Sequence, residues 1–415
     1  MCYSQAMKTV GIIVEYNPLH YGHLHHFREA KAVTKAEAVV AVMSGHFLQR
    51  GEPAVVGKWA RAEAALAMGA DLVIELPVRY SAAPAEWFAW GAVRLLAESG
   101  VVDSLCFGSE AGDLAPLRRA ARLLAREPAA FGERLKRELK KGLSYPAAYE
   151  SALAAFGGAG TPDIGKPNNN LGLHYLIALE RLGNPIVPHT IPRIGANYHD
   201  ADVTGRRIAS ATAIRRLLIG SGLAEAAHYL PEWTFAVLKR EFAAGRGPVS
   251  WESLAVPLFY RLATLSAEEL ARFEDVDEGL EYRILSALSG LRDGPASVER
   301  LLDALKTKRY TRTRLQRMLV RILLEQPKSA FTRQELERGP AYIRVLGFSD
   351  RGRHLIRRIR RASRLPVITR AGRDNAALLA EDIRATAVYA LAFREPDAWH
   401  MRRDFYQEPV MAGGG

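Results

Sequence analysis

Two histidines three residues apart, His20 and His23, flank Gly22 shortly after an apolar run at residues 10–14. An Asn-Pro pair between the run and the histidines turns the chain, because a residue before proline disfavours the helical conformation. A helix predicted over residues 22–33 aims its free N–H groups at this turn, where they favour phosphate. Both imidazoles can face the same point and stabilise charge on a leaving pyrophosphate. The loop therefore predicts an ATP site at which the bond between the α- and β-phosphates breaks.

Two other interpretations of this loop are open. His25 and His26 crowd the same segment, so a metal cluster is conceivable. Zinc usually takes three or four protein ligands, and neither a cysteine nor a nearby acidic set completes such a site in the sequence. His25 and His26 fit better on the surface or the packed face of the helix. The spacing could also arise by chance, although the preceding turn and the following helix make it far more specific.

A second segment with anion-binding character lies at residues 208–215. Ser210 or Thr212 can cap the start of a helix, and that helix N-terminus together with Arg215 would form a second cradle for phosphate. The alternative is an ordinary serine cap beside a surface arginine.

Polar residues follow other predicted strands as well. Gly108 suits a nucleobase or ribose that lies against the backbone, with a simple turn as the alternative. Asn168 belongs to an amide-rich turn that offers donors and acceptors, and Arg193 lies in the loop before the second cradle. The loop after the run at residues 38–43 is predicted to contact substrate, through Ser44, Gly45, His46, Gln49 and Arg50.

The elements that must position these residues alternate in type. Apolar runs at 10–14, 38–43, 72–76 and 105–107 are separated by helical patterns. This alternation is typical of a parallel sheet covered on both faces, so we predict a doubly wound, Rossmann-like α/β domain with ligands beyond the carboxyl ends of its strands. We place this domain at residues 1–222. A mainly helical, basic domain is expected over residues 223–415, with short strands only at 342–348 and 365–369.

Composition narrows the class of protein. The 415 residues include 57 lysines and arginines against 45 acidic residues, a formal net charge of +12. This charge favours an anionic partner such as a nucleotide, a nucleic acid or a membrane surface. The sequence has no run of about 18 apolar residues, so no transmembrane helix is expected. Two cysteines make no disulfide framework, and we expect a cytoplasmic protein without a membrane partner.

Residues 17–23 resemble the His-x-Gly-His signature of the nucleotidyltransferase superfamily, and residues 208–215 resemble its second motif, with Ala209 in place of an isoleucine. With the segments 42–54, 71–77, 107–110, 167–169, 198–200, 342–347 and 382–385, nearly the whole chain resembles the bacterial tRNA(Met) cytidine acetate ligase family. The resemblance implies that His20 and His23 are catalytic and contact the β- and γ-phosphates. It also implies ATP contacts at Ile13, Val14, Glu15, Tyr16, Asn17, Pro18, Leu19, Tyr21, Gly22, Leu24, His25, His26, Gly108, Asn168 and Arg193. Tyr21 departs from the smaller polar residue that we would expect.

The family implies a reaction in two steps. Acetate attacks the α-phosphate of ATP, which is expected to carry Mg²⁺, and the acetyl group then passes to N4 of the wobble cytidine, position 34, in elongator tRNA(Met). Candidate contacts to the tRNA backbone, with a solvated basic face as the alternative, are Lys306, Lys308, Arg309, Arg312, Arg314, Arg353, Arg357 and Arg358. Glu15, His46 and Asp200 are candidates to accept the proton of the cytidine amine.

Two other functions remain open. A small-molecule adenylyltransferase would account for the nucleotide loop, but it needs no large basic second domain. A nucleotide-sensing RNA-binding protein without catalysis would have no use for two histidines beside a phosphate site.

Overall fold

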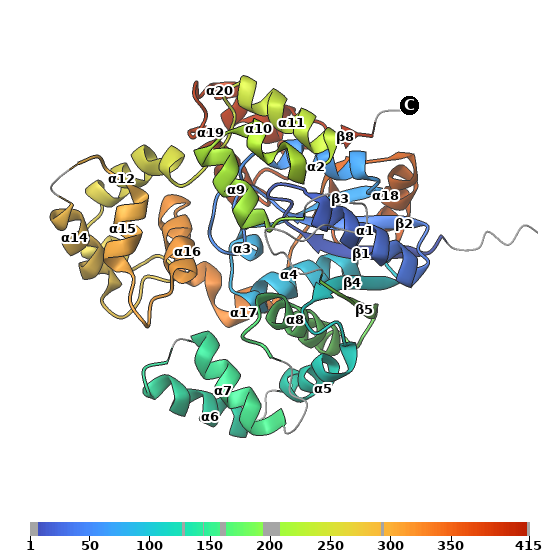
Figure 1. Ribbon diagram of the computed structural model, residues 1–415, viewed down its shortest axis with the longest axis horizontal. Coiled ribbons are helices and arrows are strands. Elements are labelled where there is room, and N and C mark those ends of the chain that lie inside the picture. Colours follow the sequence, from blue (N-terminus) through green and yellow to red (C-terminus); the bar gives the residue numbers. More distant parts are fainter. Residues whose placement is uncertain are drawn as a thin grey trace, which may run out of the picture.

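The computed structural model describes residues 7–126, 129–143, 145–157, 163–193, 208–291 and 294–412. Within these residues one sheet crosses the molecule (Figure 1), in the order β5-β4-β1-β2-β3-β6-β7, with β8 paired to β6. Its strands are β1 (Thr9–Val14), β2 (Ala38–Ser44), β3 (Leu72–Leu76), β4 (Ser104–Ser109), β5 (Val187–Pro192), β6 (Ile343–Phe348), β7 (Val367–Ile368) and β8 (Val410–Met411).

The pairings from β1 to β5 are all parallel, as predicted for a doubly wound domain. The strand β6 pairs with β3 in the antiparallel direction, while β7 and β8 pair with β6 in parallel. The sheet is therefore mixed but mostly parallel.

The predicted boundary between domains 1–222 and 223–415 does not separate the sheet from the helices, because the sheet contains strands from both sides of this boundary. The strand β6 belongs to the second part, yet five of its six residues are buried. A strand that is buried on both faces has to extend an existing sheet, since it cannot be stable alone. The sheet domain therefore takes its last three strands from a region that we expected to form a separate, mainly helical domain.

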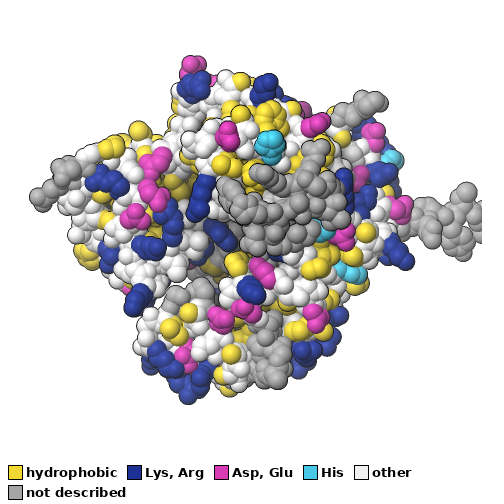
Figure 2. All heavy atoms as spheres, viewed as in Figure 1, with side chains coloured by type: hydrophobic (Ala, Val, Ile, Leu, Met, Phe, Trp, Pro, Cys, Tyr) yellow, Lys and Arg dark blue, Asp and Glu magenta, His cyan; other side chains and the backbone are white. Residues whose placement is uncertain are grey.

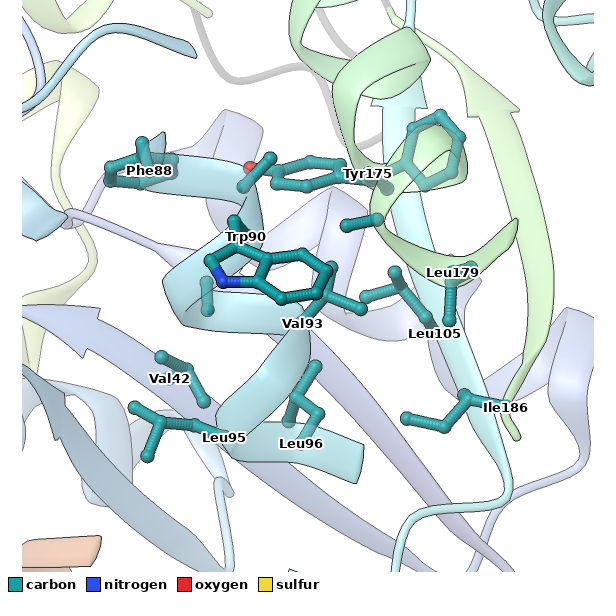
Figure 3. Packing of buried hydrophobic residues seen from close by; sticks show 14 of the residues in the cluster. Val42, Phe88, Trp90, Val93, Leu95, Leu96, Leu105, Tyr175, Leu179 and Ile186 are labelled. Carbon is teal, nitrogen blue, oxygen red and sulfur yellow. The ribbon is translucent and has the colours of Figure 1, made fainter. Parts of the chain in front are cut away.

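Helices cover both faces of the sheet. One face packs on α1 (Tyr21–Thr34) and α2 (Lys58–Met68). The other face packs on α4 (Ala85–Glu98), α8 (Pro167–Arg181) and α18 (Asp350–Ala362). Figure 3 shows side chains of α4, such as Trp90 and Leu96, against Leu105 of β4 and Leu179 of α8. Outside this layer lie α5 (Leu114–Ala125), α6 (Ala129–Lys140) and α7 (Tyr145–Gly157).

Six of the remaining helices form a group beside the carboxyl ends of the parallel strands. Its own apolar core includes Phe47 and Val78 from the sheet part and Tyr389 from a later helix, so it is joined to the sheet by packing. The group comprises η2 (Glu252–Leu254), α12 (Ala255–Thr264), α13 (Ala267–Leu270), α14 (Leu280–Gly290), α15 (Val298–Leu305) and α16 (Arg312–Leu323).

The other helices connect these parts. Short helices α3 (Val78–Ser81) and α17 (Arg333–Glu337) lie between the group and the sheet (Figure 1), and η3 (Lys328–Phe331) contacts α17. A smaller apolar cluster beside α2 contains α9 (Ala211–Gly220), α10 (Leu223–Ala226), η1 (Ala227–Tyr229) and α11 (Glu232–Ala243). The C-terminal helices are α19 (Ala380–Ala390), α20 (Ala398–Met401) and α21 (Arg403–Tyr406). In the described part of the chain, no helix combines the length and apolar character needed to cross a bilayer.

A buried charge cluster fastens the C-terminal helices to the sheet. Lys58 Nζ lies 2.8 Å from Glu75 Oε1 and 2.9 Å from Asp404 Oδ1, and all three side chains are almost fully buried. Arg344 of β6 also contacts Asp404, at 3.3 Å. Because removing one member would leave a charge buried without its partner, this cluster ties α21 and β6 firmly to α2 and β3.

Candidate active site

The two histidines of the nucleotide loop close the first turn of α1. His20 is the N-cap residue, and its Nδ1 accepts the N–H of Gly22 at 3.0 Å. The Nδ1 of His23 accepts the N–H of His20 at 3.3 Å, and the ring centroids lie 3.9 Å apart. This reciprocal pair of bonds is a capping box, in which imidazoles replace the usual hydroxyl and carboxylate.

Burial decides the protonation of these rings. Desolvation, with the positive charges of Arg193 and Arg215, lowers the pKa of His20 to about 3. Desolvation and the neighbouring His20 hold the pKa of His23 well below its ordinary value. Both rings are therefore neutral at pH 7. Since each Nδ1 accepts a hydrogen bond, each ring carries its proton on Nε2, which becomes a hydrogen-bond donor.

Gly22 leaves room for the His20 ring beside the helix N-terminus. A Cβ at this residue would lie 2.8 Å from His20 Cε1 and 3.1 Å from its Nδ1. Any side chain at residue 22 would thus push the ring away from the helix N-terminus.

A cleft of about 850 Å³ opens beside the loop, which is large enough for a nucleotide and part of a second substrate. It is lined by Ile13, Val14, Glu15, His20, Gly22, His23 and His26. Gly108, Asn168 and Arg193 line it too, so the structure brings these predicted ATP contacts to one place. A smaller pocket of about 40 Å³ lies alongside and is lined by His20, His25, Ser210 and neighbouring residues.

Other residues that were predicted to contact ATP are buried beneath the loop between β1 and α1. Tyr16, Asn17 and Leu19 are at most 3% exposed, and Asn17 Oδ1 accepts the N–H of Val55 at 2.7 Å. These contacts fix the turn between β1 and α1 rather than reach the cleft. Pro18, Tyr21 and Leu24 are likewise buried and do not line it.

Glu110, which sequence reasoning missed, positions Asn168. Its Oε1 accepts the side-chain N–H of Asn168 at 2.6 Å and its Oε2 accepts the backbone N–H of Asn169 at 2.7 Å. A carboxylate in this place also stabilises the N-terminus of α8. An acidic residue two positions after Gly108 was the available signal, because the first turn of α8 needs such an acceptor.

The second cradle is only partly assembled. Ser210 caps α9 by accepting the N–H of Ala213 at 3.2 Å, and it lines the smaller pocket. Arg215 instead donates to the carbonyl oxygen of Asn17 at 3.0 Å and forms an ion pair with Glu52 at 2.8 Å. It therefore holds two loops together. Thr212 contacts Arg215 at 3.3 Å and lines neither cavity.

The loop after β2 splits into a buried half and an open half. Gln49 and Arg50 line the cleft, whereas Ser44, Gly45 and His46 are buried away from it. The His46 ring is stacked on Tyr389, with centroids 4.2 Å apart, and is 3% exposed. Since substrate cannot reach this ring, the structure removes His46 from the candidate proton acceptors. Asp200 lies outside the described residues.

Arg61 connects the loops around the cleft. Its guanidinium donates to the carbonyl oxygens of Glu15 at 2.6 Å and Val56 at 3.2 Å, and also to that of Gly45. It is 2% exposed. Arg61 is therefore a support for both the nucleotide loop and the substrate loop.

The predicted RNA contacts fall in two separate places. Arg309 and Arg314 line the cleft together with Arg317, and Figure 2 shows dark-blue side chains where the part formed by α14–α16 meets the middle of the molecule. Lys306, Lys308 and Arg312 lie outside the cleft lining, and Arg312 pairs with Glu299 at 2.8 Å.

The arginines of α18, Arg353, Arg357 and Arg358, are remote from the cleft. Ser349, which caps α18, bonds Asp71 just before β3, and Arg351 bonds the carbonyl oxygen of Glu37 just before β2. The helix thus begins at the amino ends of the parallel strands, opposite the edge that carries the nucleotide loop (Figure 1).

Comparison with known proteins decides the family. The model of the HIGH Nucleotidyl Transferase family matches residues 7–404. A tRNA(Met) cytidine acetate ligase of Bacillus velezensis is 43% identical over 412 residues, covering 97% of both chains. Its counterpart in Acetivibrio thermocellus is 40% identical over 419 residues, covering 98% of this chain and 100% of the relative. The chain belongs to this family.

Solved structures agree with this assignment. A crystal structure of Thermotoga maritima TmcAL bound with alpha-thio ATP is 35% identical to the chain, with a TM-score of 0.87. The match covers 98% of this chain and 99% of that one. The family and the nucleotidyltransferase fold predicted from the sequence are therefore confirmed.

Proposed function

We propose that this chain is an ATP-dependent ligase that activates acetate as acetyladenylate and acetylates N4 of the wobble cytidine of elongator tRNA(Met). The observation that carries the proposal is the single cleft that joins the capped nucleotide loop to the arginines of α16, in a member of this ligase family. Its substrate tRNA would place the enzyme in the cytoplasm.

The first step uses the loop. An acetate oxygen attacks the α-phosphorus of ATP, and the bond to the bridging oxygen of the β-phosphate breaks, so pyrophosphate leaves. The Nε2–H groups of His20 and His23 donate to the β- and γ-phosphates and stabilise the growing charge without adding a proton to it. Mg²⁺ enters on the triphosphate oxygens as part of the substrate. Gly108, Asn168 and Arg193 hold the nucleoside half, with the side-chain amide of Asn168 held by Glu110.

The second step uses the open side of the cleft. Arg314 and Arg317 offer positive charge on one wall, and Arg309 beside them is paired with Glu278. The phosphates around a cytidine turned out of the anticodon loop can bind to this wall. The cytidine amine then attacks the acetyl carbonyl carbon and AMP leaves. No covalent enzyme intermediate is needed, because adenylation already gives the acetyl group a good leaving group.

Labelled acetate, ATP and bulk tRNA test the proposal directly. After digestion of the tRNA, the labelled product should have the mass of N4-acetylcytidine, and one AMP and one pyrophosphate should form for each acetyl group transferred. Pyrophosphate release without labelled tRNA, supported by a nucleotide or phosphopantetheine acceptor but not by acetate, would instead establish a small-molecule adenylyltransferase.

A further inference from the structure

Among the described residues, three carboxylates line the cleft: Glu15, Glu86 and Asp275. Glu86 is paired with Arg181 at 3.2 Å. Asp275 lies on the helical wall, near Arg317 and Arg321. Only Glu15 belongs to the nucleotide loop, five residues before His20, where the activated acetyl group must form.

The side chain of Glu15 is held in one position. Its Oε1 accepts the N–H of Gln49 at 2.8 Å, and its own carbonyl oxygen accepts from Arg61 at 2.6 Å. Its Oε2 has no hydrogen bond with any group in the described part of the chain, and the residue is only partly buried. The charged groups that face it are Arg61, Arg215 and Glu52, of which Arg215 and Glu52 pair with each other, and the titratable Tyr175 of α8 faces it as well. Glu15 therefore presents one oriented acceptor oxygen that no donor among the described residues occupies.

The histidines of the cleft are poorer acceptors. The Nδ1 atoms of His20 and His23 are already occupied, and their Nε2 atoms carry protons. The Nε2 of His26 is buried, although other atoms of this residue line the cleft. His174 lies on α8 beside Tyr149, with ring centroids 5.8 Å apart, and does not belong to the nucleotide loop.

We propose that Glu15 is the general base of the second step. Its carboxylate removes a proton from the cytidine amine as this amine attacks acetyladenylate. This inference rests on the proposed function. The C–N bond forms as the bond between the acetyl carbon and the phosphate oxygen breaks, and that oxygen leaves with the electron pair as AMP. The amine proton goes to Oε2 of Glu15 and then to solvent through the open cleft. Burial raises the pKa of Glu15, which makes it a stronger base than a surface carboxylate.

Glu15→Gln tests the role, because the amide oxygen can still accept from Gln49. Two rates are measured on the full chain: acetate-dependent exchange of pyrophosphate into ATP, and acetyl transfer to tRNA from chemically prepared acetyladenylate. Transfer should fall about 100-fold or more, and this fall should exceed any loss of exchange by about tenfold or more. The wild-type transfer rate should rise with pH through the titration of Glu15, and this rise should vanish in the variant. Glu63→Gln, on the surface beside Arg240, is the matched control.

Each other outcome overturns the inference in an identifiable way. An equal loss of exchange and transfer would make Glu15 a structural support of the loop. Unchanged transfer in Glu15→Gln, or loss of the pH-dependent rise in His174→Gln instead, would also reject Glu15 as the base. If wild-type protein shows no acetate-dependent exchange, the proposed function is wrong, and the inference about Glu15 is then wrong as well.

Discussion

His20 combines two roles that usually fall to different residues. Its Nδ1 caps α1, and its Nε2 is left as a donor toward the cleft. The bond from the Gly22 N–H to Nδ1 caps the helix and also leaves the ring proton of His20 on Nε2. The same interaction therefore fixes the start of the helix and the donor for phosphate.

The two roles of His20 can be separated by substitution. His20→Asn keeps a side-chain oxygen that caps the helix, whereas His20→Ala keeps neither the cap nor the donor. Pyrophosphate exchange should fall about 100-fold or more in both variants. The free energy of unfolding, measured in urea, should fall by about 1 kcal/mol only in the alanine variant. Wild-type exchange in His20→Asn would show that the cap alone matters.

Gly22 should be intolerant of even one methyl group. In Gly22→Ala the new Cβ would lie 2.8 Å from His20 Cε1, so the ring must leave the helix N-terminus. We expect a loss of exchange of about tenfold or more, since misplacement by about 1 Å can cost more than this. Gly132→Ala is the control, because a Cβ there meets no atom within 4 Å. Equal exchange rates in the two variants would contradict the argument.

At the scale of elements, Arg61 on α2 links the two loops that form the cleft. Arg61→Met would leave three loop carbonyl oxygens without a donor in a buried place. The free energy of unfolding should fall by about 3 kcal/mol or more. Arg338→Met removes an exposed pair with Glu335 on α17 and should cost under about 1 kcal/mol. Urea unfolding of both variants compares the two, and similar losses would argue against a linking role.

Local sequence patterns predicted where helices and strands occur better than they predicted which other segments these elements contact. The helix predicted over residues 22–33 is found at Tyr21–Thr34, and the strand predicted over residues 72–76 is found at Leu72–Leu76. The position of β6 in the sheet could not be predicted in this way. Its apolar pattern indicates that the strand is buried, but it does not indicate that the strand pairs with β3. Arg215 shows the same limit at the site, since its position was expected but its partners Asn17 and Glu52 come from distant segments.

At the scale of the whole molecule, the two groups of arginines can be told apart by tRNA kinetics. Replacing Arg309 and Arg314 by glutamine should weaken tRNA binding and reduce the slope of log affinity against log salt concentration by about 1.4 to 1.8. Replacing Arg353, Arg357 and Arg358 should leave the transfer rate at saturating tRNA unchanged, because α18 begins at the opposite edge of the sheet. A loss of transfer in the second variant would place tRNA on both edges.

The buried histidines predict a loss of stability in acid. Desolvation, with the nearby charge of Arg193, lowers the pKa of His26 to about 4, and the pKa of His20 is lower still. The unfolded chain, with histidine pKa values of about 6.5, binds more protons below that pH. Stability is therefore present above pH 6.5 and is lost as the pH falls, by about 1.4 kcal/mol per pH unit for each such histidine.

Substitution of His46 can measure how much one buried histidine contributes to the pH dependence of the unfolding free energy. Desolvation and Lys58 hold its pKa well below the ordinary value, and it bonds no group in the described part of the chain. His46→Phe should keep the stack on Tyr389 and flatten the dependence of unfolding free energy on pH between 5 and 6.5 by one histidine's share. An unchanged slope would mean that His46 binds protons equally in both states.

The antiparallel pairing of β3 with β6 has a consequence for biosynthesis. On the ribosome, the nucleotide loop and β3 emerge early, but β6 follows much later, and Asp404 lies 346 residues beyond its partner Lys58. Until then the nascent chain carries an open strand edge and a lysine that has only one of its acidic neighbours. Such an edge invites pairing with other chains. Premature termination should therefore give aggregating fragments rather than partly active enzyme, and synthesis of this protein should depend on chaperones until its last residues are released.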